Sequence, residues 1–270
     1  MSAKLLLGKP VAESICEKVN RELGVRRGKL YAIGMDCDTW KQYSNSLAKS
    51  AARYGCECEE VVVSDEATPD EFCKVVERVC EREDAIGVIV QQPLPKQYAN
   101  VVNCVDVAKD VDCLNPLSVA KLYKGENGFY PATPLAVLRL LDYYGIDLQG
   151  KRVVIVGRGN AVGKPLALMA LQRNATVTIC HTKTVDLPSV CRSADVLISA
   201  CGVAGLITKE FVTSKTVVVD VGLSFVDGKT CGDVASEVYE VAAAVSPVPG
   251  GVGPVTRATL FENLCKALND

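Results

Sequence analysis

Apolar and polar residues alternate along the first half of the chain in a way that predicts strands separated by helices. Residues 29–34, 59–64 and 86–90 are short apolar runs, each typical of a buried strand. Residues 10–23, 40–54 and 68–82 repeat apolar positions at helical spacing, and Thr68-Pro69 is a common helix start. Strands that alternate with helices predict an α/β fold, with a parallel sheet covered on both faces.

The second half repeats this alternation. Apolar runs at residues 153–156, 175–180, 195–202 and 216–222 predict a small Rossmann-type parallel sheet. A helix from Thr133 to Tyr143 or Tyr144 leads into it, and a last helix is expected over residues 257–268. Residues 247–256 are so rich in proline and glycine that we predict a loop. We therefore expect two lobes, residues 1–132 plus 255–270 and residues 133–254.

The run 153–156 ends in a glycine-rich turn that predicts a phosphate site. Gly157, Gly159 and Gly163 precede an apolar helix, and the free amides of a helix N-terminus attract phosphate groups. The spacing is one residue longer than the G-x-G-x-x-G fingerprint, so the glycines alone are a weak match. The order strand, turn, helix and second strand nevertheless favours a dinucleotide over a buried turn with a solvated arginine.

The end of the next strand favours NADP over NAD. An NAD-binding chain usually places Asp or Glu there for the ribose hydroxyls, but this chain has His181-Thr182-Lys183. Arg158, in the glycine turn, and Thr182 supply a positive charge and a hydroxyl for a ribose phosphate. Two later strands end at Gly202 and Gly222, where backbone can approach a cofactor. The predicted cofactor residues are Gly157, Arg158, Gly159, Val162, Gly163, His181, Thr182, Cys201, Gly202 and Gly222.

Two polar segments in the first half are candidate ligand sites. Gln91 and Gln92 follow the apolar run 86–90 directly, at the carboxyl end where ligands of open α/β sheets collect. Asp110 and Asp112 lie in a short loop flanked by apolar residues. On spacing alone, these carboxylates are as well explained by a turn or helix cap as by a ligand.

Composition limits the function classes. In 270 residues the net charge is −2, with mixed signs, so we expect no nucleic-acid partner. No apolar stretch has the length of a signal peptide core or a membrane span, and we expect no membrane association and a cytoplasmic location. Thirteen cysteines are read mostly as small buried residues. With one histidine and no zinc-type spacing, we expect no metal.

Taken together, the motifs resemble the bifunctional methylenetetrahydrofolate dehydrogenase/methenyltetrahydrofolate cyclohydrolase family (FolD). The family's V-Q-L-P-L-P, K-D-V-D-G and P-G-G-V-G-P-M-T elements match residues 90–95, 109–113 and 249–256. Its T-P, G-R-S-x-x-V-G-x-P and C-H-S elements match residues 133–134, 157–165 and 180–182, in the same order. The resemblance covers nearly the whole chain.

The resemblance implies a homodimer of two-lobed α/β subunits, with a tetrahydrofolate one-carbon derivative in the cleft between the lobes and NADP as hydride acceptor. It implies oxidation of methylenetetrahydrofolate to methenyltetrahydrofolate. Its catalytic positions fall on Tyr43, Gln91 and Asp110. Its substrate positions fall on Tyr43, Asp110, Asp112, Pro249, Gly250 and Gly251.

One departure changes the expected activity. The family places its catalytic lysine four residues after the tyrosine, but Leu47 stands there. Lys49 is about 120° around the helix from Tyr43. Trp40 also replaces a small serine, and Gly159 and Cys113 replace the serine and glycine of two loops.

Hydride transfer depends mainly on alignment, whereas hydrolysis needs acid–base help, so we expect a weak or absent cyclohydrolase. Three alternatives stay open. They are full bifunctionality through Lys49, a non-catalytic folate- or NADP-binding paralogue, and a dehydrogenase of another small acid, similar to shikimate dehydrogenases. The last of these leaves the Pro-Gly loop unexplained.

Overall fold

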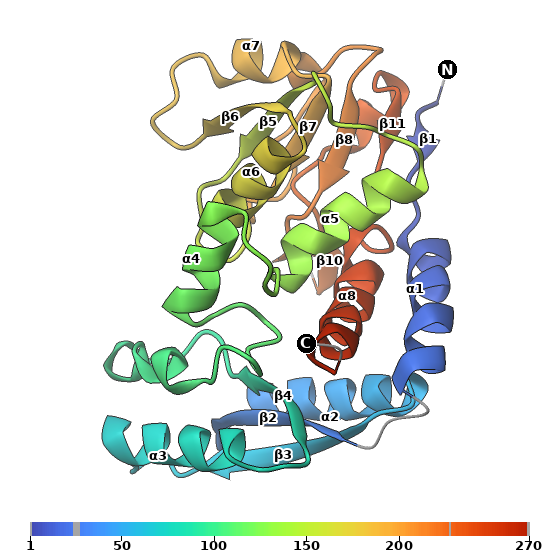
Figure 1. The fold of residues 1–270 in the computed structure, drawn as a ribbon. Helices are drawn as coiled ribbons and strands as arrows, with labels where there is room; N and C mark the ends of the chain where they lie inside the picture. Colours follow the sequence, from blue (N-terminus) through green and yellow to red (C-terminus); the bar gives the residue numbers. More distant parts are fainter. Residues whose placement is uncertain (1, 24–27, 227, 269–270) are drawn as a thin grey trace. The chain divides into compact units, whose positions relative to one another are not determined.

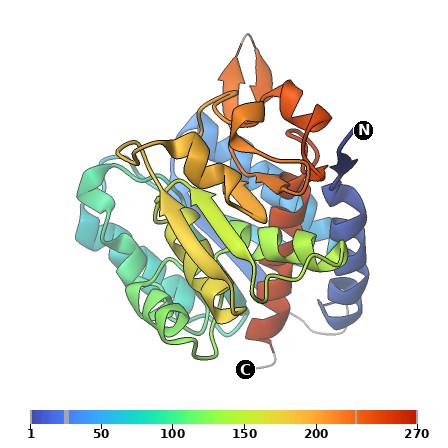
Figure 2. The same cartoon turned by 90° about the horizontal axis from the view of Figure 1, so that it is seen from above.

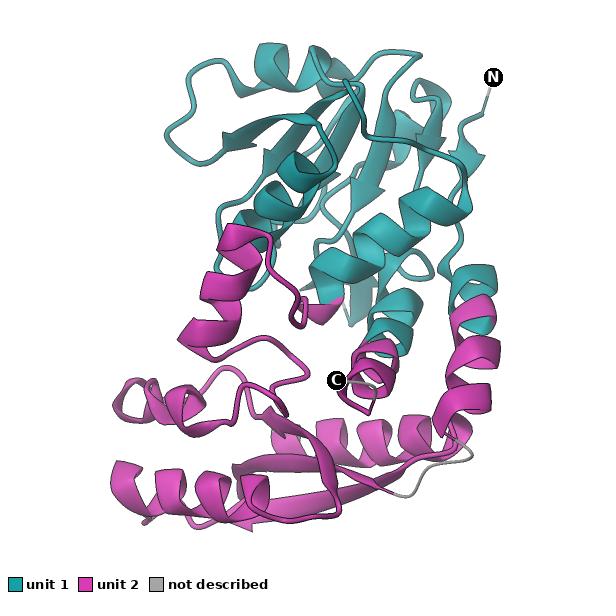
Figure 3. Ribbon diagram, viewed as in Figure 1, with its two compact units in different colours: residues 1–13, 133–259 teal, residues 14–132, 260–270 magenta. Residues whose placement is uncertain are grey.

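The structure is a computed structural model that describes residues 2–23, 28–226 and 228–268. Residues 1, 24–27, 227 and 269–270 lie outside the described part. The chain divides into two compact units, residues 14–132 with 260–270 and residues 1–13 with 133–259 (Figure 3). We call them the Tyr43 unit and the glycine-turn unit, and describe each by itself.

The Tyr43 unit is built on a three-stranded parallel sheet. Its strands are β2 (Lys29–Met35), β3 (Glu57–Val63) and β4 (Ala85–Val90), in the order β3-β2-β4. The helices are α2 (Asp38–Arg53), α3 (Pro69–Cys80), α4 (Pro116–Lys124) and most of α1 (Gly8–Leu23), with short 3-10 turns at Lys96–Tyr98 and Val101–Cys104 (Figure 1). The predicted α/β alternation of this half is confirmed.

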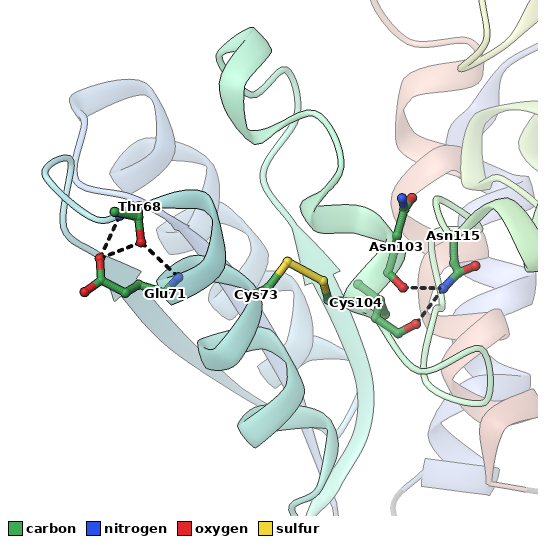
Figure 4. The surroundings of a disulfide bond; sticks show 7 residues. Thr68, Glu71, Cys73, Asn103, Cys104 and Asn115 are labelled. Atoms are coloured by element: carbon green, nitrogen blue, oxygen red, sulfur yellow. Dashed lines mark hydrogen bonds between the residues drawn. A yellow bond between two sulfur atoms is a disulfide. The ribbon is translucent and has the colours of Figure 1, made fainter.

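Helix α3 shows why the sequence folds as it does here. Thr68 accepts a hydrogen bond from the Glu71 amide, and the Glu71 carboxylate accepts one from the Thr68 amide, which makes a capping box ahead of Pro69. Its buried face carries Phe72, Val76 and Val79 into the core of the unit. A disulfide between Cys73 and Cys104 ties this helix to the second 3-10 turn (Figure 4). The other eleven cysteines are not in disulfides.

The glycine-turn unit contains a six-stranded parallel sheet in the order β1-β11-β8-β7-β5-β6 (Figure 1). Its strands are β1 (Lys4–Leu5), β5 (Arg152–Val156), β6 (Thr176–Cys180), β7 (Val196–Ser199), β8 (Val217–Asp220) and β11 (Ala244–Val245). Helix α5 (Ala132–Tyr143) precedes β5, α6 (Gly163–Gln172) connects β5 to β6, and α7 (Leu187–Arg192) connects β6 to β7. Two 3-10 turns, Lys209–Phe211 and Ser236–Glu240, complete the connections. The Rossmann-type parallel sheet expected for this half is confirmed.

A small antiparallel hairpin belongs to the same unit. Strands β9 (Ser224–Val226) and β10 (Lys229–Cys231) pair with each other, and Figure 2 shows them in orange, extending away from the parallel sheet. Phe225 is largely exposed on this hairpin. The sequence analysis did not predict the hairpin.

Two features differ from the sequence-based expectation. The first strand, β1, pairs with β11 and so places residues 1–13 in the glycine-turn unit, because Lys4 and Leu5 align in parallel with Ala244 and Val245. The prediction of a loop throughout residues 247–256 was wrong. Helix α8 (Val252–Ala267) begins inside it, and Pro254 lies in the first helical turn, where no amide hydrogen is required.

Candidate active site

A pocket of about 480 Å³ opens in the Tyr43 unit. Helix α2 supplies two aromatic residues, and the carboxyl end of β4 is followed by the two glutamines predicted from the sequence to line a ligand site. A carboxylate from the loop after Lys109 completes the wall. The lining residues are Trp40, Tyr43, Ile89, Val90, Gln91, Gln92, Pro93 and Asp112. We call this space the Tyr43 pocket.

The two aromatic rings of the Tyr43 pocket are neighbours on one helix face. Trp40 and Tyr43 have ring centroids 5.6 Å apart and planes tilted by 30°. Trp40 is 3 % exposed, whereas Tyr43 is 48 % exposed. The indole needs Gly34 on β2, since a β-carbon there would lie 2.3 Å from the ring. The pocket thus combines a fixed, deep ring with an accessible one that can stack on a flat ligand.

Gln91 is held by its neighbours at the end of β4. Its side-chain oxygen accepts a hydrogen bond from the Met35 amide at 2.7 Å, and its nitrogen donates to the Cys37 sulfur at 3.5 Å. Its peptide nitrogen donates to the Ile33 carbonyl. The amide is therefore oriented by the β2 end, and it is half-buried beside the pocket.

The two predicted carboxylates of the 109–113 loop have different surroundings. Asp110 is 1 % exposed, and its oxygens accept hydrogen bonds from the amides of Leu114 at 3.0 Å and Asn115 at 2.8 Å. This is the turn-capping arrangement that the sequence left open. Asp112 lines the Tyr43 pocket instead. Burial of its carboxyl group, with the nearby Asp110 charge, raises its pKa to about 7.

Leu47 and Lys49 take different positions on α2. Leu47 is 3 % exposed and belongs to the core, whereas Lys49 is exposed to solvent. Neither is among the described residues that line the Tyr43 pocket. The side chain four residues after Tyr43 therefore contributes apolar packing and no charge.

The glycine turn of the other unit has the close packing expected of a dinucleotide turn. Gly157 has φ +122°, and a β-carbon there would lie 2.3 Å from the Ala200 carbonyl oxygen. At Gly163, the first residue of α6, a β-carbon would lie 2.1 Å from the Gly157 carbonyl oxygen. Gly159 meets nothing within 4 Å, so only two of the three glycines are required sterically.

The predicted ribose-phosphate residues follow the ends of two neighbouring strands. Val156 on β5 is level with Cys180 on β6, and the Gly157 amide donates to the Cys180 carbonyl at 2.9 Å. Arg158 and Thr182 are the second residues beyond those two strand ends, and both are exposed. Beside Thr182, the His181 ring nitrogen accepts a hydrogen bond from the Lys183 amide.

A second pocket, of about 410 Å³, lies in the glycine-turn unit. Residues 249–251, which the sequence analysis predicted for the substrate, line this pocket together with Gly222, which it predicted for the cofactor. Gly250 has φ +109°, and Val248-Pro249 is a cis peptide. The sequence analysis missed Asp220, which also lines this pocket. A carboxylate at the end of an apolar strand was the available signal.

None of the helices in residues 2–23, 28–226 and 228–268 is both long and apolar enough to cross a membrane. In the same ranges, no group of three or more His, Cys, Asp or Glu side chains is arranged to hold a metal ion.

Two family models cover most of the chain. Residues 6–112 match the model described as tetrahydrofolate dehydrogenase/cyclohydrolase, catalytic domain, and residues 131–270 match its NAD(P)-binding domain. The chain belongs to the tetrahydrofolate dehydrogenase/cyclohydrolase family. The predicted resemblance is thereby confirmed.

Individual members of the tetrahydrofolate dehydrogenase/cyclohydrolase family agree with this assignment. The chain is 39 % identical to the bifunctional protein FolD of Clostridium botulinum, over 98 % of both chains. Its fold matches the bifunctional FolD enzyme of Campylobacter jejuni with a TM-score of 0.95 and 35 % identity, over 99 % of both chains. It also matches the Trypanosoma brucei enzyme, solved with NADP and an inhibitor, with a TM-score of 0.91 and 32 % identity, over 100 % of this chain and 98 % of that one.

Proposed function

We propose that this protein oxidises methylenetetrahydrofolate to methenyltetrahydrofolate, with NADP as the hydride acceptor. The observation that carries the proposal is the Tyr43 pocket. In this pocket an exposed aromatic face, an oriented amide and a carboxylate meet at a strand end, within a catalytic domain of the tetrahydrofolate dehydrogenase/cyclohydrolase family. A flat, amide-rich pterin has the donors and the ring surface that such a pocket selects.

The glycine-turn unit fits NADP in its chemistry. The first turn of α6, behind Gly163, offers backbone amides to a pyrophosphate. Arg158 and Thr182, beyond adjacent strand ends, supply a guanidinium and a hydroxyl for the ribose phosphate. The relative from Trypanosoma brucei was solved with NADP, which supports the same cofactor here. When bound, NADP supplies the nicotinamide that accepts the hydride.

Within the Tyr43 pocket we divide the roles by exposure. Tyr43 stacks on the substrate, because its ring is the accessible one. Asp112 accepts hydrogen bonds from the pterin. Gln91 presents an oriented amide, and Asp110 acts through the loop that it caps. Asp110 is therefore better described as a positioning residue than as the catalytic group that the resemblance implied.

We further propose that cyclohydrolase activity is weak or absent. Ring opening requires water to attack the methenyl cation and protons to be moved afterwards, which is general acid–base work. Leu47 stands where the family resemblance expects the lysine, and a buried leucine can neither donate a proton nor orient water. Gln91 can orient a water molecule, but an amide is not a base near neutral pH.

Full bifunctionality through Lys49 is the main alternative. The exposed position of Lys49 on α2, away from the lining of the Tyr43 pocket, argues against it. A non-catalytic paralogue is a second alternative. It is disfavoured because the turn glycines Gly157 and Gly163 and the pocket residues Tyr43 and Asp112 are all present.

An absorbance assay tests the proposal and both alternatives. Purified protein is mixed with methylenetetrahydrofolate and NADP, and NADPH formation and methenyl absorbance are followed together. We expect NADPH to form, and we expect the methenyl product to decay no faster than it does without enzyme. Rapid methenyl loss would favour full bifunctionality, and binding of both ligands without turnover would favour the paralogue.

We also propose a homodimer and a cytoplasmic location. A homodimer is expected, and Leu223, Phe225 and Val226 on or beside the β9–β10 hairpin give an exposed apolar surface in the glycine-turn unit. Light scattering on the purified protein tests it. A cytoplasmic location is also proposed, since eleven of the thirteen cysteines are not in disulfides, and fluorescence microscopy of a tagged chain tests it.

A further inference from the structure

Two buried carboxylates that the proposed reaction does not use lie in the glycine-turn unit. Asp233 is 0 % exposed and Asp220 is 1 % exposed. Asp220 ends β8, and Asp233 follows the β9–β10 hairpin. The Asp233 amide donates to the Asp220 carboxylate at 3.0 Å, so the two acids are directly linked. Buried carboxylates need several donors to compensate for lost hydration.

Asp233 collects its donors from one short segment, at the end of β7. One carboxylate oxygen accepts from the Ser199 hydroxyl at 2.8 Å and the Cys201 amide at 2.9 Å. The other accepts from the Val203 amide at 2.8 Å. The Cys201 thiol, whose pKa burial raises to about 11, stays protonated and donates at 3.1 Å. In the described part of the chain, these donors are hydroxyl, thiol and backbone groups, without a basic side chain.

The loop fixed by Asp233 approaches Gly157, and the Asp233 carboxylate itself approaches Gly222. Ala200, inside this loop, has its carbonyl oxygen where a β-carbon on Gly157 would be 2.3 Å away. On the next strand, a β-carbon on Gly222 would lie 2.0 Å from an Asp233 oxygen. Asp220 holds the Gly222 amide at 3.0 Å. The Asp233 carboxylate therefore sets the position of backbone at the ends of β7 and β8, against the glycine turn.

We propose that Asp233 is a positioning residue for the dinucleotide, which acts by holding residues 199–203 against Gly157 while its own carboxylate packs against Gly222. The inference rests on the proposed use of NADP. The Asp233 carboxylate accepts from four donors through two oxygens, whereas an amide of the same shape replaces one acceptor with a donor. Asp233→Asn then turns an N–H group toward hydroxyl or amide donors and displaces the loop.

The test compares Asp233→Asn with a matched control, Asp195→Asn. Asp195 precedes the opposite end of β7, where its carboxylate accepts from the Arg152 amide at 2.8 Å. NADPH binding is measured by the cofactor's own fluorescence, without turnover, and steady-state constants are measured for both substrates. We expect Asp233→Asn to weaken NADPH binding and raise the KM for NADP by about tenfold or more. The KM for methylenetetrahydrofolate should stay within about twofold, and Asp195→Asn should resemble the wild type.

A purely structural role gives a different result, because a smaller folded fraction lowers the maximum rate and leaves both KM values unchanged. That pattern, or equal NADPH affinity in Asp233→Asn and wild type, overturns the inference. If the wild type itself binds no NADPH, the proposed function fails instead. If Asp233→Asn does not fold, Ser199→Ala removes one donor and leaves both backbone donors. It should raise the KM for NADP by a few-fold, and an unchanged value there also overturns the inference.

Discussion

Leu47 follows Tyr43 by about one helical turn on α2, yet Leu47 is 3 % exposed and Tyr43 is 48 % exposed. The tyrosine lines the pocket, whereas the leucine belongs to the buried core. A charged side chain at position 47 would leave the helix on the same face as Tyr43, within an apolar environment. Under the proposed function, substrate binding at Tyr43 is retained while the group for product hydrolysis is absent at Leu47.

Leu47→Lys should therefore increase methenyl hydrolysis above the wild-type rate. A well-placed general acid or base increases a rate by about 10²–10⁴-fold. Because position 47 is buried, we expect Leu47→Lys to give only part of that increase. Decay of methenyl absorbance measures it. Lys49→Ala is the matched control and should leave hydrolysis unchanged. Vigorous wild-type hydrolysis that Lys49→Ala abolishes would contradict the proposal.

Arg158→Ala should selectively weaken NADP. A charge-assisted contact to phosphate contributes about 1.5–3 kcal/mol, or about one to two decades of affinity. The KM for NADP should rise accordingly, with NAD use nearly unchanged. Arg152→Ala, at the opposite end of β5, is the control. Equal effects of Arg158→Ala on both cofactors would show that Arg158 does not contact the phosphate.

Binding of the folate should depend on pH through Asp112. Its pKa is raised to about 7 by burial and by Asp110, and the pterin donors favour the ionised carboxylate. Between pH 8 and pH 6 the ionised fraction falls about tenfold, so the KM for methylenetetrahydrofolate should rise by about that factor as pH falls. Asp112→Asn should remove this pH dependence and weaken binding at pH 8. A flat wild-type profile would argue against Asp112 as the pterin acceptor.

The same shift makes a prediction for stability. Because the folded-state pKa of Asp112 lies above the ordinary value of 3.8, protonation of Asp112 stabilises the folded protein. This contribution to the free energy of unfolding is complete below about pH 4 and is lost as pH rises through 7. Asp112→Asn should therefore raise the melting temperature relative to wild type more at pH 8 than at pH 5. Thermal unfolding at the two pH values measures the difference, with Asp106→Asn, an exposed carboxylate of the same segment, as control.

Trp40 should report folate binding directly. It is the one tryptophan of the sequence, and it lines the Tyr43 pocket beside the ring that we expect to stack. Addition of 5-formyltetrahydrofolate, a reduced folate that is stable in air, should quench its emission with saturation. The Tyr43→Ala variant should need a higher concentration for half-quenching. Unchanged emission at saturating folate would place the ligand elsewhere.

The parallel sheets could be predicted because β2, β4, β5 and β8 are apolar runs buried on both faces, and such runs are visible in sequence. The pairing of β1 with β11 could not. Two-residue strands have no periodicity, and their partners are distant in the chain. The start of α8 was missed because glycine and proline are read as breakers, although both are tolerated in a first helical turn.

The site was predicted unevenly, for physical reasons. Tyr43, Gln91 and Asp112 adjoin clear strand or helix signals, and the structure brings them to one pocket. Asp110 and Asp112 could not be separated by sequence, because a cap and a ligand carboxylate differ in which amides approach them. Asp233 had no signal of its own, since its donors lie thirty or more residues earlier in the chain.

The pairing of β1 with β11 also has a consequence for how the protein is made. In the glycine-turn unit, Lys4 and Leu5 of the edge strand pair with Ala244 and Val245, which lie 240 residues later in the chain. During synthesis, residues 244–245 must therefore leave the ribosome before β1 can join this sheet. Contacts of such sequence separation slow folding and prolong exposure of apolar strand edges. Chains truncated before residue 244 should consequently depend on chaperones and be prone to aggregation.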